Sequence, residues 1–183
     1  MRFFKNVIIV VASFSLIAFL LMYLLKRSKE EILKEKEQTV KVAWNAFSSD
    51  LTIRDSLIKS FASTKFDSLK YFEQKSMFES AKNESNLDLE YFEFKINNYL
   101  LANFPNEKVL IKLYDKLNND LANYNALTKE YNVYISTFPN FIVAKRLHYH
   151  KAKYFSIKYG GTNEDPILKS KELPEWAKGV DTN

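Results

Sequence analysis

The sequence contains no cysteine, and its few glycines and prolines are confined to the C-terminal part. Without cysteine, the chain has no disulfide, thiol nucleophile, thiolate metal ligand or cysteine-linked lipid. The first proline is Pro105 and the first glycine is Gly160. A β-protein needs turn residues every few positions, so this composition predicts long helices. The absence of glycine before residue 160 also excludes a glycine-rich phosphate loop from that part of the chain.

Charged residues are absent from one run, residues 7–25, with the sequence VIIVVASFSLIAFLLMYLL. As a helix these residues would reach roughly 28 Å, which is close to the hydrocarbon thickness of a bilayer. The run is longer than the apolar part of a cleaved signal peptide, and no small-x-small cleavage site follows it. We therefore expect an uncleaved signal-anchor, a single-pass transmembrane helix within an N-terminal anchor of residues 1–27.

The flanks of this run predict the orientation of the protein in the cell membrane. Arg2 and Lys5 precede the run, and a larger number of basic residues follows it. Such an excess marks the cytoplasmic side, so the N-terminus is expected outside and the C-terminal domain in the cytoplasm. The net charge of +5 is modest. An anionic membrane surface explains it without a nucleic acid partner. The basic residues on the C-terminal flank are Lys26, Arg27, Lys29, Lys34, Lys36 and Lys41.

Residues 28–158 are expected to form a helical bundle, and residues 159–183 a flexible C-terminal tail. Strong helix formers follow the apolar run, so the membrane helix should continue into the domain without a linker. An apolar stripe then begins, and Arg54 interrupts it. The arginine either meets a carboxylate or polar row inside the bundle, or places its charge at the bundle edge. The stripe consists of Val40, Trp44, Phe47, Leu51, Ile58 and Phe61.

Further helices are predicted over residues 65–78, 89–103 and 110–138, with a loop at 80–88 and a short helix at 141–147. The loop holds a weak glycosylation sequon at Asn83. The third of these helices has apolar and aromatic residues at heptad spacing, which is typical of lengthwise, coiled-coil-like packing. Tyr124, Tyr131 and Phe138 should therefore be buried against the first helix. The expected fold is all-α, with the transmembrane helix followed by an antiparallel bundle of three to four long helices.

Asparagines recur along the same helix at Asn118, Asn125 and Asn132, each directly after a residue of the heptad seam. Such a row can form a binding strip. Asparagine at a helix seam more often bonds across to a neighbouring helix and fixes the packing register. The structural interpretation is therefore favoured.

The block from Tyr124 to Phe155 resembles the C-terminal signature of the LemA family, membrane-anchored helical proteins of bacteria. Upstream, Trp44 and Arg54 stand where the family's first helix has a tryptophan and an arginine. Ser56 and Lys59 replace the family's aspartate and proline, and His148-Tyr149 replaces a glycine-phenylalanine, so the chain is similar to a divergent member. The matching elements of the block are Tyr124-Asn125, Tyr131-Asn132, Phe138-Pro139, Val143-Ala144 and Tyr154-Phe155.

This resemblance implies a helical bundle with a short external N-terminus and a cytoplasmic bulk. The family has no assigned enzymatic activity, and the residues agree, because no nucleophile stands beside a plausible base. His148 and His150 are best interpreted as surface imidazoles, since no acidic residue lies near them in sequence to complete a metal site. We therefore predict no catalytic residue, no cofactor and no metal.

The segment Lys145–Lys158 mixes cations with aromatic rings and contains no acidic residue. Its candidate interaction residues are Lys145, Arg146, Lys151 and Lys153. Two functions remain open: a non-enzymatic membrane-tethered scaffold or protein-interaction module, and a protein that organises lipid through anionic headgroups. With three helices alternating in direction, the Phe138-Pro139 turn would lie far from the lipid, which favours an acidic protein partner or the chain's own acidic tail. A further interpretation is that the aromatic residues of this segment only cover the end of the bundle. The protein is also a candidate for homo-oligomer formation.

Overall fold

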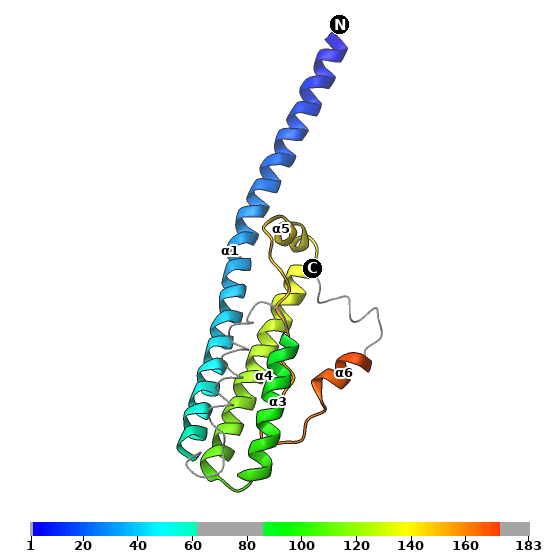
Figure 1. Cartoon of the computed structure of the whole chain (residues 1–183). Coiled ribbons are helices and arrows are strands. Elements are labelled where there is room, and N and C mark those ends of the chain that lie inside the picture. The colour runs from blue at the N-terminus through cyan, green and yellow to red at the C-terminus, as the bar shows by residue number, and fades with distance from the viewer. Residues whose placement is uncertain (1, 62–85, 173–183) are drawn as a thin grey trace. The chain divides into compact units, whose positions relative to one another are not determined.

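The computed structural model describes residues 2–61 and 86–172, and the regular structure within these ranges is entirely helical. This confirms the all-α fold for the described part of the chain. The helices, labelled in Figure 1, are α1 (Arg2–Phe61), α3 (Asn86–Asn103), α4 (Lys108–Ser136), α5 (Asn140–Arg146) and α6 (Pro166–Glu172). The predicted helix at 65–78 and loop at 80–88 lie outside the described residues.

Helix α1 continues without interruption from the apolar run into the domain, as predicted. No breaker residue occurs along it, and its charged middle part places Glu and Lys four residues apart, as in the ion pair between Lys41 and Glu37 at 3.0 Å. Within the described residues, no helix is long and apolar enough to cross a membrane. The side chains at 7–10, 18, 21–22 and 24–25 of the apolar run lie outside the described part.

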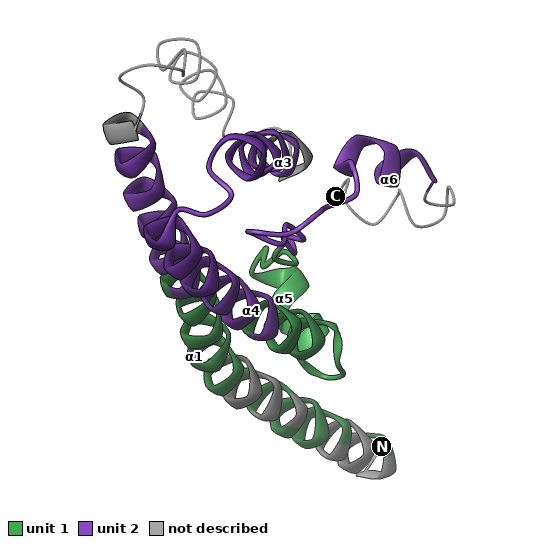
Figure 2. Ribbon diagram, turned by 90° about the horizontal axis from the view of Figure 1, so that it is seen from below, with its two compact units in different colours: residues 1–42, 127–152 green, residues 43–126, 153–183 purple. Residues whose placement is uncertain are grey.

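The chain divides into two compact units, coloured separately in Figure 2. Unit 1 comprises residues 1–42 and 127–152, and unit 2 comprises residues 43–126 and 153–183. Helices α1 and α4 each contribute residues to both units. The two units are described separately below.

In unit 2, α1 and α4 run in opposite directions. The Trp44 ring packs on Tyr124 with centroids 5.0 Å apart, and Asp50 is paired with Lys116. As the residue number rises along α1, that of its partner therefore falls along α4. Apolar residues from α1, α3 and α4 fill the centre of this unit, among them Phe47, Phe92, Ile96, Leu110 and Leu117.

An extended segment, residues 153–161, is the fourth element of unit 2. Its side chains alternate, so that Phe155, Ile157 and Tyr159 are buried while the residues between them are exposed. This alternation with a period of two is that of a half-buried strand, although the partners here are helices. The Phe155 ring lies 5.9 Å from Trp44 and 5.6 Å from Phe47, which closes an aromatic cluster between α1 and α4.

The predicted heptad seam of α4 is confirmed over most of its length. Tyr124 and Tyr131 are buried, as expected. Phe138 is a correction, because its side chain is 73% exposed. The helix ends at Ser136, two residues before the Phe-Pro pair, so Phe138 no longer follows the helical repeat that would turn it inward. The other buried seam residues are Leu110, Tyr114, Leu117, Leu121, Thr128 and Ile135.

In unit 1, the end of α4 points toward the N-terminal end of α1. Lys36 lies 3.9 Å from Glu130, whereas Lys29, nearer the N-terminus, lies over the ring of Tyr134. The short helix α5 follows α4 after the Phe138-Pro139 turn (Figure 1).

This direction corrects the prediction that the Phe138-Pro139 turn lies far from the end of the apolar run. In unit 2, α3 is antiparallel to α4 and so runs the same way as α1. Along α3, Glu90 binds residue 156 and Asn97 binds residues 160–161, so the numbers of the partners rise with the helix. Along α4, Asn118 binds residue 159 and Asn125 binds residue 155, so the numbers of the partners fall. Helix α4, and not α3, is therefore the helix that returns.

The predicted flexible tail, residues 159–183, also needs a correction over its first part. Tyr159 is 2% exposed, Pro166 is buried, and α6 contacts α3. The glycines and proline of this region permit turns that place buried groups. Residues 173–183 lie outside the described part.

Candidate functional site

The asparagine row of α4 binds the backbone of the extended segment. In unit 2, the Asn125 amide donates to the Phe155 carbonyl at 2.7 Å and accepts from the Phe155 N–H at 3.1 Å. Asn118 makes the same pair of bonds to Tyr159, at 2.9 Å each. Each side-chain amide thus replaces the backbone of a neighbouring strand, donating and accepting at a single residue.

The spacing of the asparagines matches the spacing of the backbone groups they bind. Seven helical residues from Asn118 to Asn125 advance about 10.5 Å. Four extended residues from Phe155 to Tyr159 can span at most about 13 Å, so a slightly bent segment stays in register. The structural interpretation of the row is confirmed, but its partner is an extended segment and not another helix.

Asn97 of α3 provides the equivalent contact at the end of the segment. Its side chain accepts from the Gly160 N–H at 2.9 Å and donates to the Gly161 carbonyl at 2.8 Å. Gly160 has φ of +70°, and a Cβ there would lie 2.7 Å from the Tyr114 ring. Glycine is therefore required at this position for two reasons: the left-handed backbone and the close approach of the ring.

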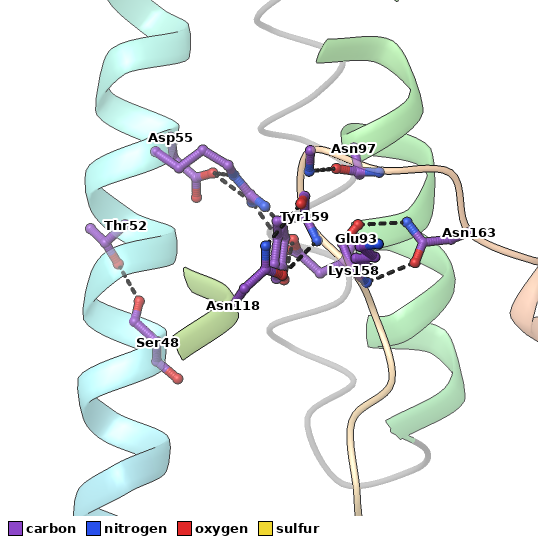
Figure 3. A network of polar contacts seen from close by, with 11 residues as sticks. Ser48, Thr52, Asp55, Glu93, Asn97, Asn118, Lys158, Tyr159 and Asn163 are labelled. Atoms are coloured by element: carbon purple, nitrogen blue, oxygen red, sulfur yellow. Dashed lines mark hydrogen bonds and ion pairs between the residues drawn. The ribbon is translucent and has the colours of Figure 1, made fainter. Parts of the chain in front are cut away.

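Arg54 lies at the centre of a buried ionic cluster in unit 2. Its guanidinium pairs with Glu93 of α3 and donates to the neighbouring Asp55 at 2.9 Å. The Tyr159 hydroxyl donates to Glu93 at 3.1 Å, which ties the extended segment to the same cluster. Figure 3 shows Glu93, Asn97 and Asn118 gathered around Tyr159. Of the two interpretations of Arg54, the buried pair is the one observed, with the arginine only 1% exposed.

The environment of Tyr159 keeps its hydroxyl protonated. Burial raises the pKa of Tyr159 well above its ordinary value, and the Glu93 carboxylate raises it further, against the opposing effect of Arg54. The phenol is therefore a hydrogen-bond donor at neutral pH. This donor also helps to stabilise the charge of the Glu93 carboxylate.

In unit 1, the same kind of contact holds residues 150–152. Asn132 donates to the Ala152 carbonyl and accepts from its N–H, both at 2.8 Å. The Tyr131 hydroxyl donates to the His150 carbonyl at 3.0 Å. Burial raises the pKa of Tyr131 to about 12, with smaller contributions from Glu37 and Tyr149. Binding of backbone groups is thus common to Asn118, Asn125 and Asn132.

A shallow pocket of about 430 Å³ lies in unit 1. The Tyr134 ring receives the ammonium groups of Lys29 and Lys36 at 5.9 and 5.6 Å from its centroid. The Tyr134 hydroxyl and the Asn140 side-chain oxygen are buried without a hydrogen-bond partner. Glu130 adds a negative charge to the same wall, so the pocket is not a simple anion site. It is lined by Lys36, Lys129, Glu130, Val133, Tyr134, Thr137 and Asn140.

Asp50 and Asp120 form the closest approach to a carboxylate pair. Asp50 is buried and accepts a hydrogen bond from Lys116, while its second oxygen has no partner. The Asp50 carboxyl raises the pKa of Asp120, since a shared proton and like charge both favour the neutral acid. Lys116 links the two groups, 4.0 Å from Asp120. This arrangement satisfies a buried charge.

The predicted interaction residues do not gather around either the pocket or the ionic cluster. In unit 1, Lys145, Arg146 and Lys151 are exposed, and in unit 2 so is Lys153. His148 and His150 are exposed as well. Across residues 2–61 and 86–172, no group of three or more His, Asp or Glu side chains is arranged to hold a metal ion.

The other signature residues occupy varied positions. Trp44 is half-buried in the aromatic cluster of unit 2, Ala144 is buried in α5, and Tyr154 is exposed next to the buried Phe155. Pro139 forms a cis peptide bond with Phe138. The signature thus combines core, backbone-binding and surface positions.

The polar residues that complete the sites were not predicted. Glu93 and Asn97 are buried on α3, for which the sequence predicted only a helix. Their spacing of four, between Phe92, Ile96 and Leu100, places them on that same face. The signal was present, as two polar residues within an apolar face. Tyr159 was missed because it precedes two glycines and was assigned to the tail.

A family model, that of the LemA family, matches residues 107–169, which span α4, α5, the extended segment and the start of α6. No curated protein and no solved structure matches the chain. The matched range contains the asparagines of α4 and the backbone groups they bind. The resemblance to the LemA family is thereby confirmed over residues 107–169.

Proposed function

We propose that this protein is a non-enzymatic, membrane-tethered helical scaffold that presents a basic surface to an acidic protein partner. The observation that carries the proposal is the use of the polar signature residues. The amides of Asn118, Asn125 and Asn132 bind backbone, and Arg54 is paired with carboxylates. These groups position an extended segment, and its exposed side chains are left for contact with other molecules.

The tether in this proposal is the apolar run, residues 7–25. Support comes from its length, its lack of charge and its position in one continuous helix with the rest of α1. The described side chains of the run are exposed and apolar, with Phe14 at 71% and Phe19 at 73% exposed. Exposed apolar side chains of this size are unfavourable in water, whereas lipid solvates them.

The proposed orientation places the N-terminus outside the cell and the helical domain in the cytoplasm, on the basis of the flanking basic residues. A reporter enzyme that is active only in the cytoplasm, fused after Asn183, tests it. We expect activity from this fusion and none from a periplasm-specific reporter at the same position. Mass spectrometry of the mature protein should find residues 1–25 retained. Activity of the periplasmic reporter, or loss of residues 1–25, would refute the corresponding part.

The interaction surface in this proposal consists of Lys145, Arg146, Lys151 and Lys153. The experiment replaces these four residues with glutamine and repeats crosslinking in the native membrane. We expect loss of the main crosslinked partner without a change in thermal stability, since the side chains are exposed. A matched control replaces the exposed Lys108 and Lys112 of α4. An unchanged set of partners in the four-residue variant would contradict the proposed surface.

A second candidate function is lipid organisation through anionic headgroups. The observation that favours it is the exposure of Phe138, Phe141 and Ile142 next to Lys145 and Arg146. Interleaved rings and cations suit a membrane surface. Binding of a variant lacking residues 1–27 to anionic vesicles, after its helical fold has been verified by circular dichroism, would favour this function over the first.

A further inference from the structure

The turn after α4 and the start of α5 carry apolar side chains that are exposed in unit 1. Phe138 is 73% exposed, Phe141 is 45% and Ile142 is 39%. The rings of Phe138 and Phe141 lie together, with centroids 6.3 Å apart. We refer to these three residues as the α5 apolar face. Two adjacent aromatic rings left open to solvent mark a contact surface more often than chance exposure.

The height of this face along α1 follows from contacts within unit 1. The Tyr134 ring lies between the ammonium groups of Lys29 and Lys36, so it stands beside the turn of α1 that contains Leu33. The helix continues in the direction of the N-terminal end of α1 as far as Ser136, which adds about 3 Å. Phe138 follows two residues beyond the helix end, which brings it level with roughly residues 28–31.

This height coincides with the headgroup layer expected around the apolar run. If the run ends at Leu25, residues 28–31 lie about 5–9 Å beyond the hydrocarbon edge. The polar layer on each side of a bilayer is about 5–8 Å thick. The face is therefore at the level of the headgroup layer of the bilayer that holds the apolar run.

The charges around the face are complementary to an anionic surface. Lys145 and Arg146 are exposed in the last turn of α5, and Arg27 is exposed on α1. The sequence from Thr137 to Asn163 contains no acidic residue. Glu30 and Glu31 on α1 are exposed and offset part of this charge. Apolar contact thus provides the insertion, and the cations of α5 provide the attraction to anionic headgroups.

We propose that the α5 apolar face rests in the headgroup layer of the same bilayer that anchors residues 7–25, with Phe138, Phe141 and Ile142 inserted at the interface. This proposal rests on the proposed membrane tether. It assigns Lys145 and Arg146 to the headgroups and leaves Lys151 and Lys153 for the acidic protein partner. It gives unit 1 two points of contact with the membrane, the transmembrane helix and the α5 face. Such a contact restricts rotation of the helical domain about its anchor.

The natural absence of cysteine makes the test direct, because single cysteines can be introduced into the full chain for spin labelling. We would label Phe138→Cys and Phe141→Cys in vesicles of phosphatidylglycerol and phosphatidylcholine. Collisions with lipid-dissolved oxygen and with a water-soluble nickel chelate are then compared. We expect both labels to favour oxygen. Lys129→Cys, exposed on α4 nine residues before Phe138, is the matched control and should favour the nickel chelate.

A label at Leu16→Cys separates failure of this inference from failure of the tether. Oxygen preference at residue 16 together with nickel preference at residues 138 and 141 would overturn the α5 contact and leave the tether intact. Nickel preference at all three positions would overturn both. Protection of residues 138 and 141 from both reagents would show that a protein, such as a second copy or a partner, covers the face, and would likewise overturn the proposal.

The role of charge is tested separately with Lys145→Gln and Arg146→Gln combined in the Phe138→Cys chain. We expect the oxygen preference at residue 138 to fall in vesicles containing phosphatidylglycerol and to remain unchanged in pure phosphatidylcholine. An equal fall in both lipids would contradict the assignment of these two cations to anionic headgroups.

Discussion

At the scale of single residues, Arg54 provides a positive charge that neutralises the buried Glu93 carboxylate. The arginine is 1% exposed and Glu93 is 2% exposed, so neither charge is solvated by water. A buried pair of this kind adds little net stability compared with apolar residues of the same volume, but removing one partner leaves the other uncompensated. Arg54 is therefore expected to be indispensable, although its net contribution to stability is small.

Replacing Arg54 with alanine should lower the free energy of unfolding by about 3–5 kcal/mol, because Glu93 then remains buried without the guanidinium with which it pairs. Chemical denaturation followed by circular dichroism measures the change. Lys41→Ala is the control, since it breaks the exposed pair with Glu37 and should cost less than about 1 kcal/mol. Equal effects of the two substitutions would mean that the Arg54 cluster is hydrated.

The raised pKa of Tyr131 predicts a loss of stability at alkaline pH. Its folded pKa of about 12 exceeds the ordinary value of 10.0. Below pH 10 both states keep the proton, and the contribution to stability is complete. Between pH 10 and about 12 the unfolded state releases its proton first, so the free energy of unfolding falls with rising pH. Tyr159 contributes in the same direction.

Denaturant unfolding of the wild-type chain and of Tyr131→Phe across this pH range tests the prediction. At neutral pH the variant should lose about 0.5–1.5 kcal/mol, the net value of its hydrogen bond to the His150 carbonyl. The difference between the two proteins should shrink as the pH approaches 12. A constant difference would show that Tyr131 does not titrate with a raised pKa.

At the scale of elements, the extended segment depends on the asparagines of α4 for its backbone hydrogen bonds. Asn125→Ala removes both bonds to Phe155 and should cost about 1–3 kcal/mol, since the Phe155 N–H and carbonyl lose their partner near the core. Hydrogen exchange at the Phe155 amide should accelerate more than at the amides of α4. Asn123, exposed two residues earlier, is the matched control, and its alanine variant should change stability by less than about 0.5 kcal/mol.

If Asn125→Ala and Asn123→Ala had the same stability and the same exchange at Phe155, the amide contacts would not hold the segment.

The helices could be predicted from the sequence because their signals are periodic and local. The heptads of α4, the breaker-free length of α1 and the apolar face of α3 each follow from residue spacing alone. The role of residues 153–161 could not be predicted in this way. The hydrogen-bond partners of this segment lie about thirty to sixty-six residues away in the chain. A local sequence pattern cannot identify partners at such a distance. The asparagine row was recognised, but a neighbouring helix was assumed to be its partner.

At the scale of the whole molecule, the predicted direction of the last long helix was wrong, whereas its inward-facing residues were correct except for Phe138. The direction of a helix depends on how many times the chain has reversed before it. The spacing of apolar side chains does not reveal the number of reversals, because a helix has the same apolar stripe in either direction. The corrected direction is what brings the α5 apolar face near the level of the apolar run in unit 1.

The asparagine contacts also determine how residues 153–161 tolerate changes in length. A segment without regular structure usually accepts insertions and deletions. Here the amides are fixed on rigid helices, so removing Ser156 would move the backbone past Asn118 by one residue. It would also turn the side chains of the shifted part to the opposite face, because strand-like chains alternate with a period of two. Ile157 and Tyr159 would then leave the core.

We therefore expect deletion of Ser156 to destabilise the chain far more than Ser156→Gly, as measured by thermal unfolding. Comparable melting temperatures would show that the segment can slip along α4. Among related sequences, gaps should fall outside this segment and collect in the connections between helices. A region with the appearance of a loop would thus be as intolerant of length changes as the middle of a β-sheet.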